Sequence, residues 1–420
     1  MPGTPTAGRT FRDSVALLGT RRFGTFWVAT LLSSMGTWAQ QVAEPWLLLS
    51  LGASPFVVGL DAFAMDAPVW GLTLLGGVLA DRADRRWVIL LFQSIQMLCP
   101  MLVVALLLGA AVQPWMIVGL SLVVGVTDAL SMPSFQSIVP SIVAYEQIGT
   151  GIALNSTQLN LSRILGPAVA GILMVRVGAL GCFVVSALSY VPFILVALWI
   201  LPRRDPSPGL ARPIESRPPF AGSRKIVRTP ALRGPLLTVF ATSTLCSPLV
   251  TFCPVLVKDV FHADASHFGG ALAAFGLGGL AGATGLLAVE GRVDGRRLCA
   301  RSAVGYGVIV VAAAVNQWLL PLMALLGLAG AAMTVSNASA NTLLQRLAGP
   351  RLRGQTASLY MLAIRGGRAL GALLTGGAVH VFGVRWALVV DGTLAVLVQL
   401  ALARSPVADR LAREDAGQAS

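Results

Sequence analysis

The chain has 420 residues, of which 55% are hydrophobic and only 12% are charged, and its mean hydropathy is +0.76. A soluble globular domain normally carries about twice that fraction of charged residues, so the composition excludes an ordinary soluble protein. The net charge of +13 is spread over alternate polar stretches beside apolar ones, and this distribution argues against a nucleic-acid-binding protein.

Apolar windows long enough to cross a membrane recur along the whole chain. A transmembrane helix needs roughly 18 or more predominantly apolar residues to cross about 30 Å of hydrocarbon, and twelve windows meet this requirement. They are residues 24–49, 56–80, 87–109, 115–139, 153–176, 181–201, 235–257, 269–290, 302–320, 322–345, 358–382 and 386–404. The sequence therefore predicts an all-α membrane protein with twelve transmembrane helices.

The positive residues between these windows alternate from one side of the membrane to the other. If the N-terminus is cytoplasmic, the outer loops and helix ends hold only Arg176, Lys258 and Arg385, and the remaining loop arginines and lysines are cytoplasmic. Arg and Lys are preferentially retained on the cytoplasmic side. We therefore expect a multi-pass protein of a bacterial inner membrane with both termini in the cytoplasm.

One long polar stretch separates the first six windows from the last six. Residues 202–234 are rich in Pro, Arg, Ser and Gly, a composition typical of a linker. We expect an N-terminal six-helix half at 1–201, a cytoplasmic linker at 202–234, a C-terminal six-helix half at 235–404 and a cytoplasmic tail at 405–420.

The two halves share a motif in the fifth window of each. The pattern R-x-x-G-x4-G-x6-G occurs twice, 205 residues apart. Its two copies are Arg163, Gly166, Gly171 and Gly178, and Arg368, Gly371, Gly376 and Gly383. Glycines match by chance easily in a chain with 45 of them, whereas an intramembrane arginine at the same register does not. The repeat predicts two pseudo-symmetric six-helix units.

The stretch GGVLADRADRRW, residues 76–87, gathers charges between the second and third windows. Its Gly77, Leu79, Ala80, Asp81, Arg82, Arg85 and Arg86 resemble the G-x-L-a-D-r-x-G-r-r/k signature of the major facilitator superfamily. The resemblance implies two six-helix halves, transport by alternating access, and a cytoplasmic gate that Asp81 and Arg82 help to latch. Asp84 occupies the position where many members have Gly. The equivalent loop of the second half holds a degenerate copy of the motif that includes Asp294, but the spacing of its Asp differs.

A second motif is SRILGPAVAG, residues 162–171, in the fifth window. It is similar to the antiporter signature G-x-x-x-G-P-x-x-G-G at Gly166, Pro167 and Gly171, and departs from it at Ser162 and Ala170. Longer stretches within roughly residues 11–404 resemble the transmembrane secretion effector group and the exporter branch that includes the enterobactin exporters. These resemblances imply export driven by inward proton flow.

Motifs of common enzymes are missing from the sequence. There is no G-x-x-x-x-G-K-[ST], H-E-x-x-H, C-x-x-C or G-x-S-x-G pattern, and neither Lys225 nor Lys258 lies in a phosphate-binding context. The five cysteines lie in or beside apolar windows without metal-ligand spacing to a histidine. We expect no enzyme activity, no ATP hydrolysis, no cofactor and no metal site.

Eight charged residues lie inside the apolar windows and away from the window ends, and a charge at the centre of a spanning helix costs about 2.5 to 3.5 kcal/mol. They are Asp66, Asp128, Arg163 and Arg368 near mid-window, Arg365 one turn from Arg368, and Glu44, Asp61 and Asp391 in the outer halves. Asp128 and Arg163 lie at similar depth on consecutive windows. They could form a structural ion pair or take part in transport.

Asp66 is the best candidate for proton coupling, since a carboxyl group removed from water is suited to proton exchange. In the superfamily the second and eleventh spans approach each other, so the resemblance makes Arg365 or Arg368 plausible partners of Asp66. Arg163 and Arg368 could also bind helix carbonyls or an anionic substrate, or serve packing alone. The predicted proton-coupling or charge network is Asp66, Asp128, Arg163, Arg365 and Arg368.

Polar residues at helical spacing form a second candidate set. Gln40, Gln41 and Glu44 share one side of the first window, and Asn337 and Asn341 are four residues apart in the tenth. Such residues could line a substrate cavity or form hydrogen bonds between helices. The predicted cavity residues are Gln40, Gln41, Glu44, Asp61, Asn337 and Asn341.

These features favour a monomeric secondary transporter that exports small organic molecules, either drug-like compounds or siderophores, in exchange for protons. Its expected partners are the substrate, protons and the lipid bilayer, and neither nucleic acid nor ATP. One alternative is an importer or facilitator of a small metabolite. Another is a membrane sensor or scaffold without transport, with the linker at 202–234 as its partner site.

Overall fold

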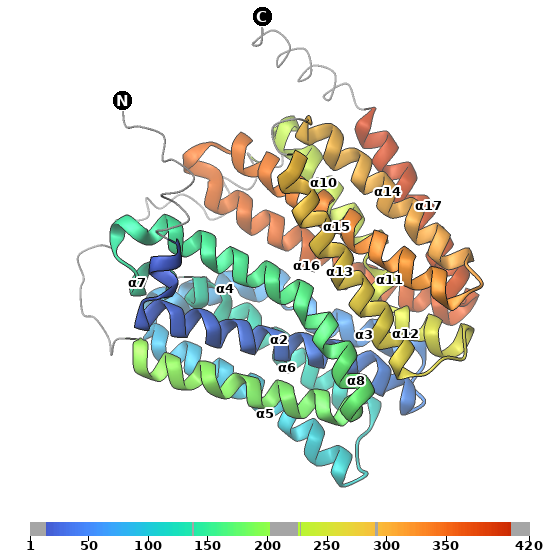
Figure 1. Ribbon diagram of the computed structural model, residues 1–420, viewed down its shortest axis with the longest axis horizontal. Coiled ribbons are helices and arrows are strands. Elements are labelled where there is room, and N and C mark those ends of the chain that lie inside the picture. Colours follow the sequence, from blue (N-terminus) through green and yellow to red (C-terminus); the bar gives the residue numbers. More distant parts are fainter. Residues whose placement is uncertain (1–13, 137, 202–225, 227, 290–292, 405–420) are drawn as a thin grey trace, which may run out of the picture. The chain divides into compact units, whose positions relative to one another are not determined.

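The computed structural model describes residues 14–136, 138–201, 226, 228–289 and 293–404. All the regular secondary structure in these residues is helical (Figure 1). The chain clusters into two compact units, Met1–Leu47 with Pro68–Pro206, and Leu48–Ala67 with Ser207–Ser420. The second unit therefore includes a short segment from the first half of the sequence.

Each unit is built from long helices joined by short connections. The first contains α2 (Arg21–Ser50, whose final residues belong to the second unit), α4 (Val69–Arg82), α5 (Arg85–Leu108), α6 (Pro114–Gln136), α7 (Ile138–Ile142), a 3₁₀ turn (Tyr145–Gln147) and α8 (Ile148–Ile200). The second contains α3 (Pro55–Asp66), α10 (Pro230–Leu245), α11 (Pro248–Thr251), α12 (Cys253–Val255), a π-helical turn (Leu256–Val260), α13 (Ala265–Val289), α14 (Gly295–Val315), α15 (Leu319–Leu347), α16 (Gly349–Phe382) and α17 (Val384–Ala403).

Nine helical segments of the described residues are long and apolar enough to cross a membrane. The predicted windows that this set leaves out are 24–49 in α2 and 358–382 in α16, and it covers window 153–176 of α8 only from Val169 onward; all three windows are helical. They carry polar or charged residues, such as Glu44 in α2 and Arg368 in α16, which lower their hydropathy. The least apolar helices are thus the ones that hold many of the predicted functional residues.

The second predicted window, 56–80, is interrupted near its middle. Helix α3 ends at Asp66 and α4 begins at Val69, with Pro68 between them. Proline lacks the backbone N–H of a helical hydrogen bond, and its ring clashes with the carbonyl group four residues earlier. Because α3 clusters with the second unit and α4 with the first, the chain passes from one unit to the other at this proline.

The glycines that end the repeated motif have the same conformation in both copies. Gly178 has φ +65° within α8, and Gly383 has φ +79° between α16 and α17. Glycine adopts this left-handed region without the steric penalty that a Cβ atom brings. The sharp turn after the fifth predicted helix of each half is therefore encoded by the last glycine of the motif.

The core of the first unit includes three aromatic rings from three helices. Phe26 of α2, Phe135 of α6 and Phe193 of α8 are mutual neighbours, and the rings of Phe135 and Phe193 stack with centroids 5.3 Å apart. Phe26 and Phe193 are almost fully buried. Because offset aromatic pairs contribute beyond the area they bury, this cluster fixes the packing of α2, α6 and α8.

Close glycine packing joins α13 and α15 in the second unit. A Cβ atom at Gly278 would collide with the backbone of Gly327, and one at Gly330 would collide with the backbone of Phe275. A Cβ atom at Gly282 would lie 2.7 Å from the carbonyl oxygen of Ala331. Small residues let helix backbones approach closely in membranes, and the glycine-rich run 273–285 serves this purpose.

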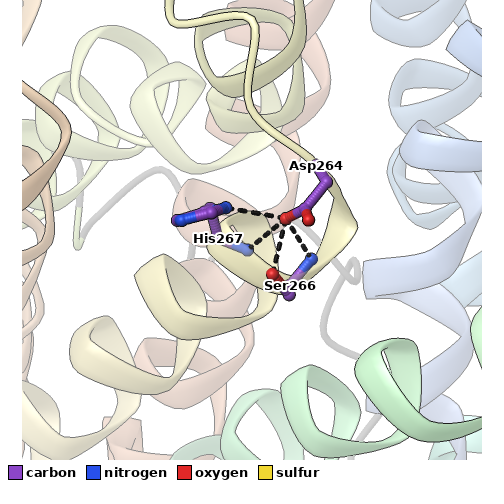
Figure 2. Close-up of polar contacts among 3 residues, drawn as sticks. All are labelled: Asp264, Ser266 and His267. Atoms are coloured by element: carbon purple, nitrogen blue, oxygen red, sulfur yellow. Dashed lines mark hydrogen bonds and ion pairs between the residues drawn. The ribbon is translucent and has the colours of Figure 1, made fainter.

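A hydrogen-bonded carboxylate begins α13 (Figure 2). Asp264 Oδ1 accepts hydrogen bonds from the Ser266 hydroxyl at 2.5 Å and from the backbone N–H groups of Ser266 at 3.1 Å and His267 at 3.2 Å; it lies 2.7 Å from Nδ1 of His267. The bonds from the Ser266 hydroxyl and then from His267 hold the pKa of Asp264 well below its usual range. This geometry is a helix N-cap.

The glycine contact between α13 and α15 predicts a position-specific effect on stability. Gly278→Ala should lower the free energy of unfolding by about 1–3 kcal/mol, because the new methyl group collides with a backbone. Gly285→Ala on the same helix, where a Cβ atom meets nothing within 4 Å, should be neutral or slightly stabilising. Thermal unfolding in detergent measures both, and equal Tm values would contradict the contact.

The cap of α13 predicts a pH-dependent effect of Asp264→Ala. Because the folded pKa is depressed, the stabilisation by the carboxylate is complete above the unfolded pKa of about 3.9 and is lost as the pH falls below it. The Tm difference from the wild type should stay constant from about pH 7 to pH 5 and shrink below about pH 4. A Tm difference at about pH 3 that equals the difference at about pH 7 would contradict the cap.

Candidate functional site

An intramembrane ion pair joins α3 and α16 within the second unit. Nη2 of Arg368 lies 2.9 Å from each carboxylate oxygen of Asp66. The Asp66 side chain is 11% exposed and that of Arg368 is 36% exposed. Arg368 is one of the two arginines that the family resemblance predicted as partners of Asp66. Its Nε atom is buried and has no hydrogen-bond partner among the described residues.

Small residues bring the two helices of the ion pair together. A Cβ atom at Gly59 of α3 would collide with the carbonyl oxygen of Ala372 and lie 3.1 Å from Cα of Gly376 on α16. From Gly59 to Asp66 is two helical turns along α3, and from Gly376 to Arg368 is about the same length of α16. The glycine contact therefore sets the spacing at which Asp66 meets Arg368.

Three other predicted charges lie on the same helices or beside them. Asp61 is buried on α3, five residues before Asp66, and Arg365 is three residues before Arg368 on α16. Asp391 of α17 accepts a hydrogen bond from Thr375 of α16. The second unit thus gathers five of the eight intramembrane charges onto α3, α16 and α17.

The second predicted pair, Asp128 with Arg163, belongs to the first unit. Asp128 is half-buried on α6, and Arg163 is in the first part of α8. The side chains of Arg163 and Pro167 lie outside the described part of the structure. The two roles predicted for Asp128 and Arg163, a structural ion pair or a part in transport, therefore both stay predictions.

A buried hydrogen-bond network joins α2, α6 and α8 in the first unit. Gln40 Nε2 donates to Glu44 Oε1 at 3.1 Å, and Ser121 Oγ donates to the same oxygen at 3.3 Å. Ser186 Oγ donates to Gln40 Oε1 at 3.0 Å. All four side chains are buried, whereas Gln41 is half-buried. The geometry supports interhelix bonding by Gln40 and Glu44, the second of the two roles weighed for them.

Two glutamines of α5 extend the polar interior of this unit and are not among the residues predicted from the sequence. Gln93 Nε2 donates to Gln96 Oε1, and Gln96 Nε2 donates to the Thr127 hydroxyl, both at 3.3 Å. The glutamines are buried, and Thr127 precedes Asp128 on α6. Their spacing of three residues in an apolar window was the available signal.

A pocket with polar residues lies along the last turns of α15. It has a volume of about 340 Å³ and is lined by Asn341, Thr342, Gln345 and Arg346. Asn337, one turn earlier, is half-buried, and its backbone carbonyl accepts a hydrogen bond from Tyr360. Of the two predicted asparagines, Asn341 therefore lines this pocket and Asn337 is not among its lining residues.

The residues of the predicted gate motif lie at the junction of α4 and α5. Gly77 is in α4, Asp81 and Arg82 are its last residues, and Arg85 and Arg86 begin α5. The side chains of Asp81, Arg82 and Arg85 lie outside the described part of the structure. Arg86 donates to the carbonyls of Leu198 at 2.8 Å and Leu201 at 3.2 Å, and so caps the C-terminal end of α8.

The structure explains both aspartates that depart from the motif. Asp84 accepts a hydrogen bond from the backbone of Arg86 and is the N-cap of α5. Asp294 accepts one from the backbone of Arg296 and is the N-cap of α14. Each has an extended backbone, as N-cap residues do. The second copy therefore keeps the helix cap of the first.

The glycines of the antiporter-like motif pack tightly against other helices of the same unit. A Cβ atom at Gly166 would collide with the side chain of Trp38 on α2, and Gly171 is buried. At the equivalent position of the repeat, a Cβ atom on Gly371 would collide with the backbone of Thr244 on α10. In both units the fifth predicted span therefore packs on the first through the same glycine.

The chemistry available to this arrangement is proton exchange and hydrogen bonding. Within the described residues, no group of three or more His, Cys, Asp and Glu side chains could hold a metal ion. The carboxyl group of Asp66 can bind and release a proton. Its partner Arg368 offers a further donor that suits an anionic oxygen.

Solved transporter structures share this fold. The crystal structure of the nucleoside transporter NupG matches 91% of this chain and 98% of its own, with a TM-score of 0.72 and 12% identity. A bacterial homologue of the human lysosomal transporter Spinster, in an inward-facing unoccupied conformation, matches 91% of this chain and 97% of its own, with a TM-score of 0.69 and 17% identity.

Curated sequences give similarity to siderophore transporters at low identity. The enterobactin exporter EntS of Shigella flexneri is 26% identical over 363 residues, which are 84% of each chain. The staphyloferrin A transporter of Staphylococcus aureus is 23% identical over 260 residues, which are 61% of this chain and 64% of that transporter. The match thus spans less than two thirds of the second relative.

The family model for transmembrane secretion effectors matches residues 13–418, nearly the whole chain. Together with the exporter relatives and the transporter structures, it confirms the prediction of a multi-pass membrane transporter that is not an enzyme. This chain belongs to the transmembrane secretion effector family of major facilitator transporters.

Proposed function

We propose that this transporter exports small organic molecules, of siderophore or drug-like kind, in exchange for protons. It works by alternating access as a monomer, with twelve spans in two pseudo-symmetric six-helix halves. Both termini lie on the cytoplasmic side of a bacterial inner membrane, and neither ATP nor nucleic acid takes part. The observation that carries the proposal is the ion pair between Asp66 and Arg368.

Protonation of Asp66 is the chemical step that drives the cycle. A proton added to the carboxylate neutralises it, and Arg368 loses the charge that its guanidinium faces. Removing one partner from a buried ion pair costs about 3–5 kcal/mol, and the partial exposure of Arg368 makes the cost here smaller. The contact between α3 and α16 is therefore weaker when Asp66 is protonated.

The position of Asp66 in the chain connects this change to movement. Asp66 is the last residue of α3, and Pro68 separates α3 from α4. Helix α3 packs on α16 in the second unit, whereas α4 packs on α6 in the first. A change in the contact between α3 and α16 thus occurs next to Pro68, where the chain passes from one unit to the other. This position suits a hinge.

Two sets of residues are candidates for substrate contact. Asn341 lines the α15 pocket with Arg346, and Arg368 retains a buried N–H donor without a partner in the described part of the chain. Arginine and amide groups suit the oxygen-rich, often anionic surface of a siderophore. Gln41 and Asp61 remain candidates for the outer part of the cavity, and Gln40 and Glu44 would contact substrate only by exchanging their present bonds.

Export is favoured over import by the relatives and by the motif in α8. The relative from Shigella flexneri is named an exporter, and Gly166, Pro167 and Gly171 match an antiporter-like signature. An importer or facilitator remains the first competitor, and a non-transporting sensor the second. They differ in the direction or presence of flux.

Asp66→Asn should uncouple transport from the proton gradient. The amide keeps the size of the side chain but cannot ionise, so it cannot alternate between a charged and a neutral state. One proton supports about 2.3 kcal/mol per 100 mV, or about a 50-fold substrate gradient, and this accumulation should collapse. Uphill substrate movement in inverted membrane vesicles with an imposed pH gradient measures the effect.

The matched control for that variant is Asp259→Asn, which removes an exposed carboxylate of the same unit. It should transport like the wild type. Unchanged proton-driven transport by Asp66→Asn protein would exclude Asp66 as the coupling residue.

Cells that express the gene should retain less of its substrate than cells without it. We expect a panel of dyes, antibiotics and siderophores to include compounds whose retention falls with wild-type protein, rises again with Asp66→Asn protein, and rises when the proton gradient is collapsed. Increased accumulation would favour an importer. Absence of flux from correctly folded wild-type protein in proteoliposomes, across the panel, would favour a sensor or scaffold.

A further inference from the structure

A second intramembrane carboxyl group lies beside α16 and plays no part in the ion pair. Thr375 Oγ1 of α16 donates to Oδ2 of Asp391 on α17 at 2.6 Å. Thr375 is buried and Asp391 is half-buried. Asp391 lies within Val384–Ala403, one of the segments apolar enough to cross a membrane.

The groups around Asp391 include no cation that pairs with it in the described part of the chain. Helix α17 packs against α14, α16 and α10. The titratable groups of these helices near Asp391 include Cys246 at the end of α10. The Tyr306 hydroxyl of α14 donates to the Cys246 carbonyl at 3.3 Å. An intramembrane ionisable residue is by default a hypothesis for a functional site, and Asp391 meets this description.

The nearest basic residues along the chain are engaged or lie elsewhere. Arg385 of α17 donates from Nη2 to the carbonyl of Asn316 at 3.1 Å, and His380 of α16 is exposed. Arg368 pairs with Asp66 two helical turns before Thr375. Asp66 therefore has a cation and Asp391 has a neutral hydroxyl donor, so the two carboxyl groups respond differently to a proton.

The depth of the Thr375–Asp391 pair places it between the α16–α17 turn and the ion pair. Asp391 is seven residues inside α17, or about 10 Å from its first residue at the helical rise, and Arg368 is fourteen residues, or about 21 Å, before the end of α16. In the topology proposed above, this turn faces the outside. A proton entering from the outer solution reaches Asp391 before it reaches Asp66.

We propose that Asp391 is a second proton-binding site of this transporter, with Thr375 as its positioning residue. The inference rests on the proposed proton coupling and adds a second proton to it. In the binding step a proton from the outer solution forms an O–H bond with the Asp391 carboxylate, and no other covalent bond changes. The same proton leaves when the carboxylate is regenerated.

Infrared difference spectroscopy of the full-length protein in membranes, titrated with pH, tests this site without transport. The wild type should show a protonated-carboxyl band that Asp391→Asn removes. Asp391→Glu should retain a titrating band at a shifted frequency, which also serves if the Asn variant fails to fold. A spectrum unchanged by Asp391→Asn overturns the proposal.

Threonine variants test the positioning role. Thr375→Val removes the donor to Asp391 and should shift both the frequency and the titration midpoint of the band. Thr393→Val is the matched control on α17, because its hydroxyl bonds to the carbonyl of Val389 in its own helix, and it should leave the band unchanged. Equal bands in Thr375→Val and wild-type protein would remove Thr375 from the site.

The Asp66→Asn protein separates this inference from the proposed function. If Asp66 is not the coupling residue, Asp66→Asn protein transports normally while the Asp391 band still titrates. If both proposals hold, Asp391→Asn should lower the number of protons moved per substrate by about one and leave transport that depends on Asp66. An unchanged proton ratio with an unchanged spectrum would overturn the second site alone.

Discussion

The cost of placing charged and polar groups in hydrocarbon is the constraint on which this structure depends. Asp66 and Arg368 meet it as an ion pair, with Nη2 at 2.9 Å from both carboxylate oxygens. Gln40 and Glu44 meet it through serine hydroxyls of neighbouring helices. Each of these contacts joins different helices. The contacts that satisfy the buried polar groups therefore also determine which helices pack together.

Small residues make these pairings possible, because side chains of ordinary size would keep the backbones too far apart. Gly59 and Gly376 let α3 approach α16, and the pair Asp66–Arg368 lies two turns away along both helices. Glycine lacks a side chain to bury, so its use here trades hydrophobic burial for backbone proximity. In the mechanism proposed above, this contact between the short helix α3 and the long helix α16 is made and broken as Asp66 loses and gains a proton.

The internal repeat keeps backbone geometry more closely than side-chain contacts. Gly178 and Gly383 both adopt a positive φ, and Gly166 and Gly371 both pack on the first helix of their half. The neighbour is the indole of Trp38 in one case and the backbone of Thr244 in the other. Asp84 and Asp294 likewise cap equivalent helices although the charges around them differ. The repeated glycines and caps thus specify turns and close approaches that the two units share.

The sequence by itself determined the helical membrane class, the transporter family and the repeat, because hydropathy, charge asymmetry and glycine spacing are local properties of the chain. The resemblance to the major facilitator superfamily also narrowed the partner of Asp66 to two arginines, Arg365 and Arg368. Only the tertiary structure decided that the partner is Arg368, that Gln40 and Glu44 bond to serines, and that Thr375 meets Asp391. Contacts between side chains of different helices depend on the rotation of each helix and on the distance between the helix backbones. Neither quantity can be predicted from the residues of one helix alone.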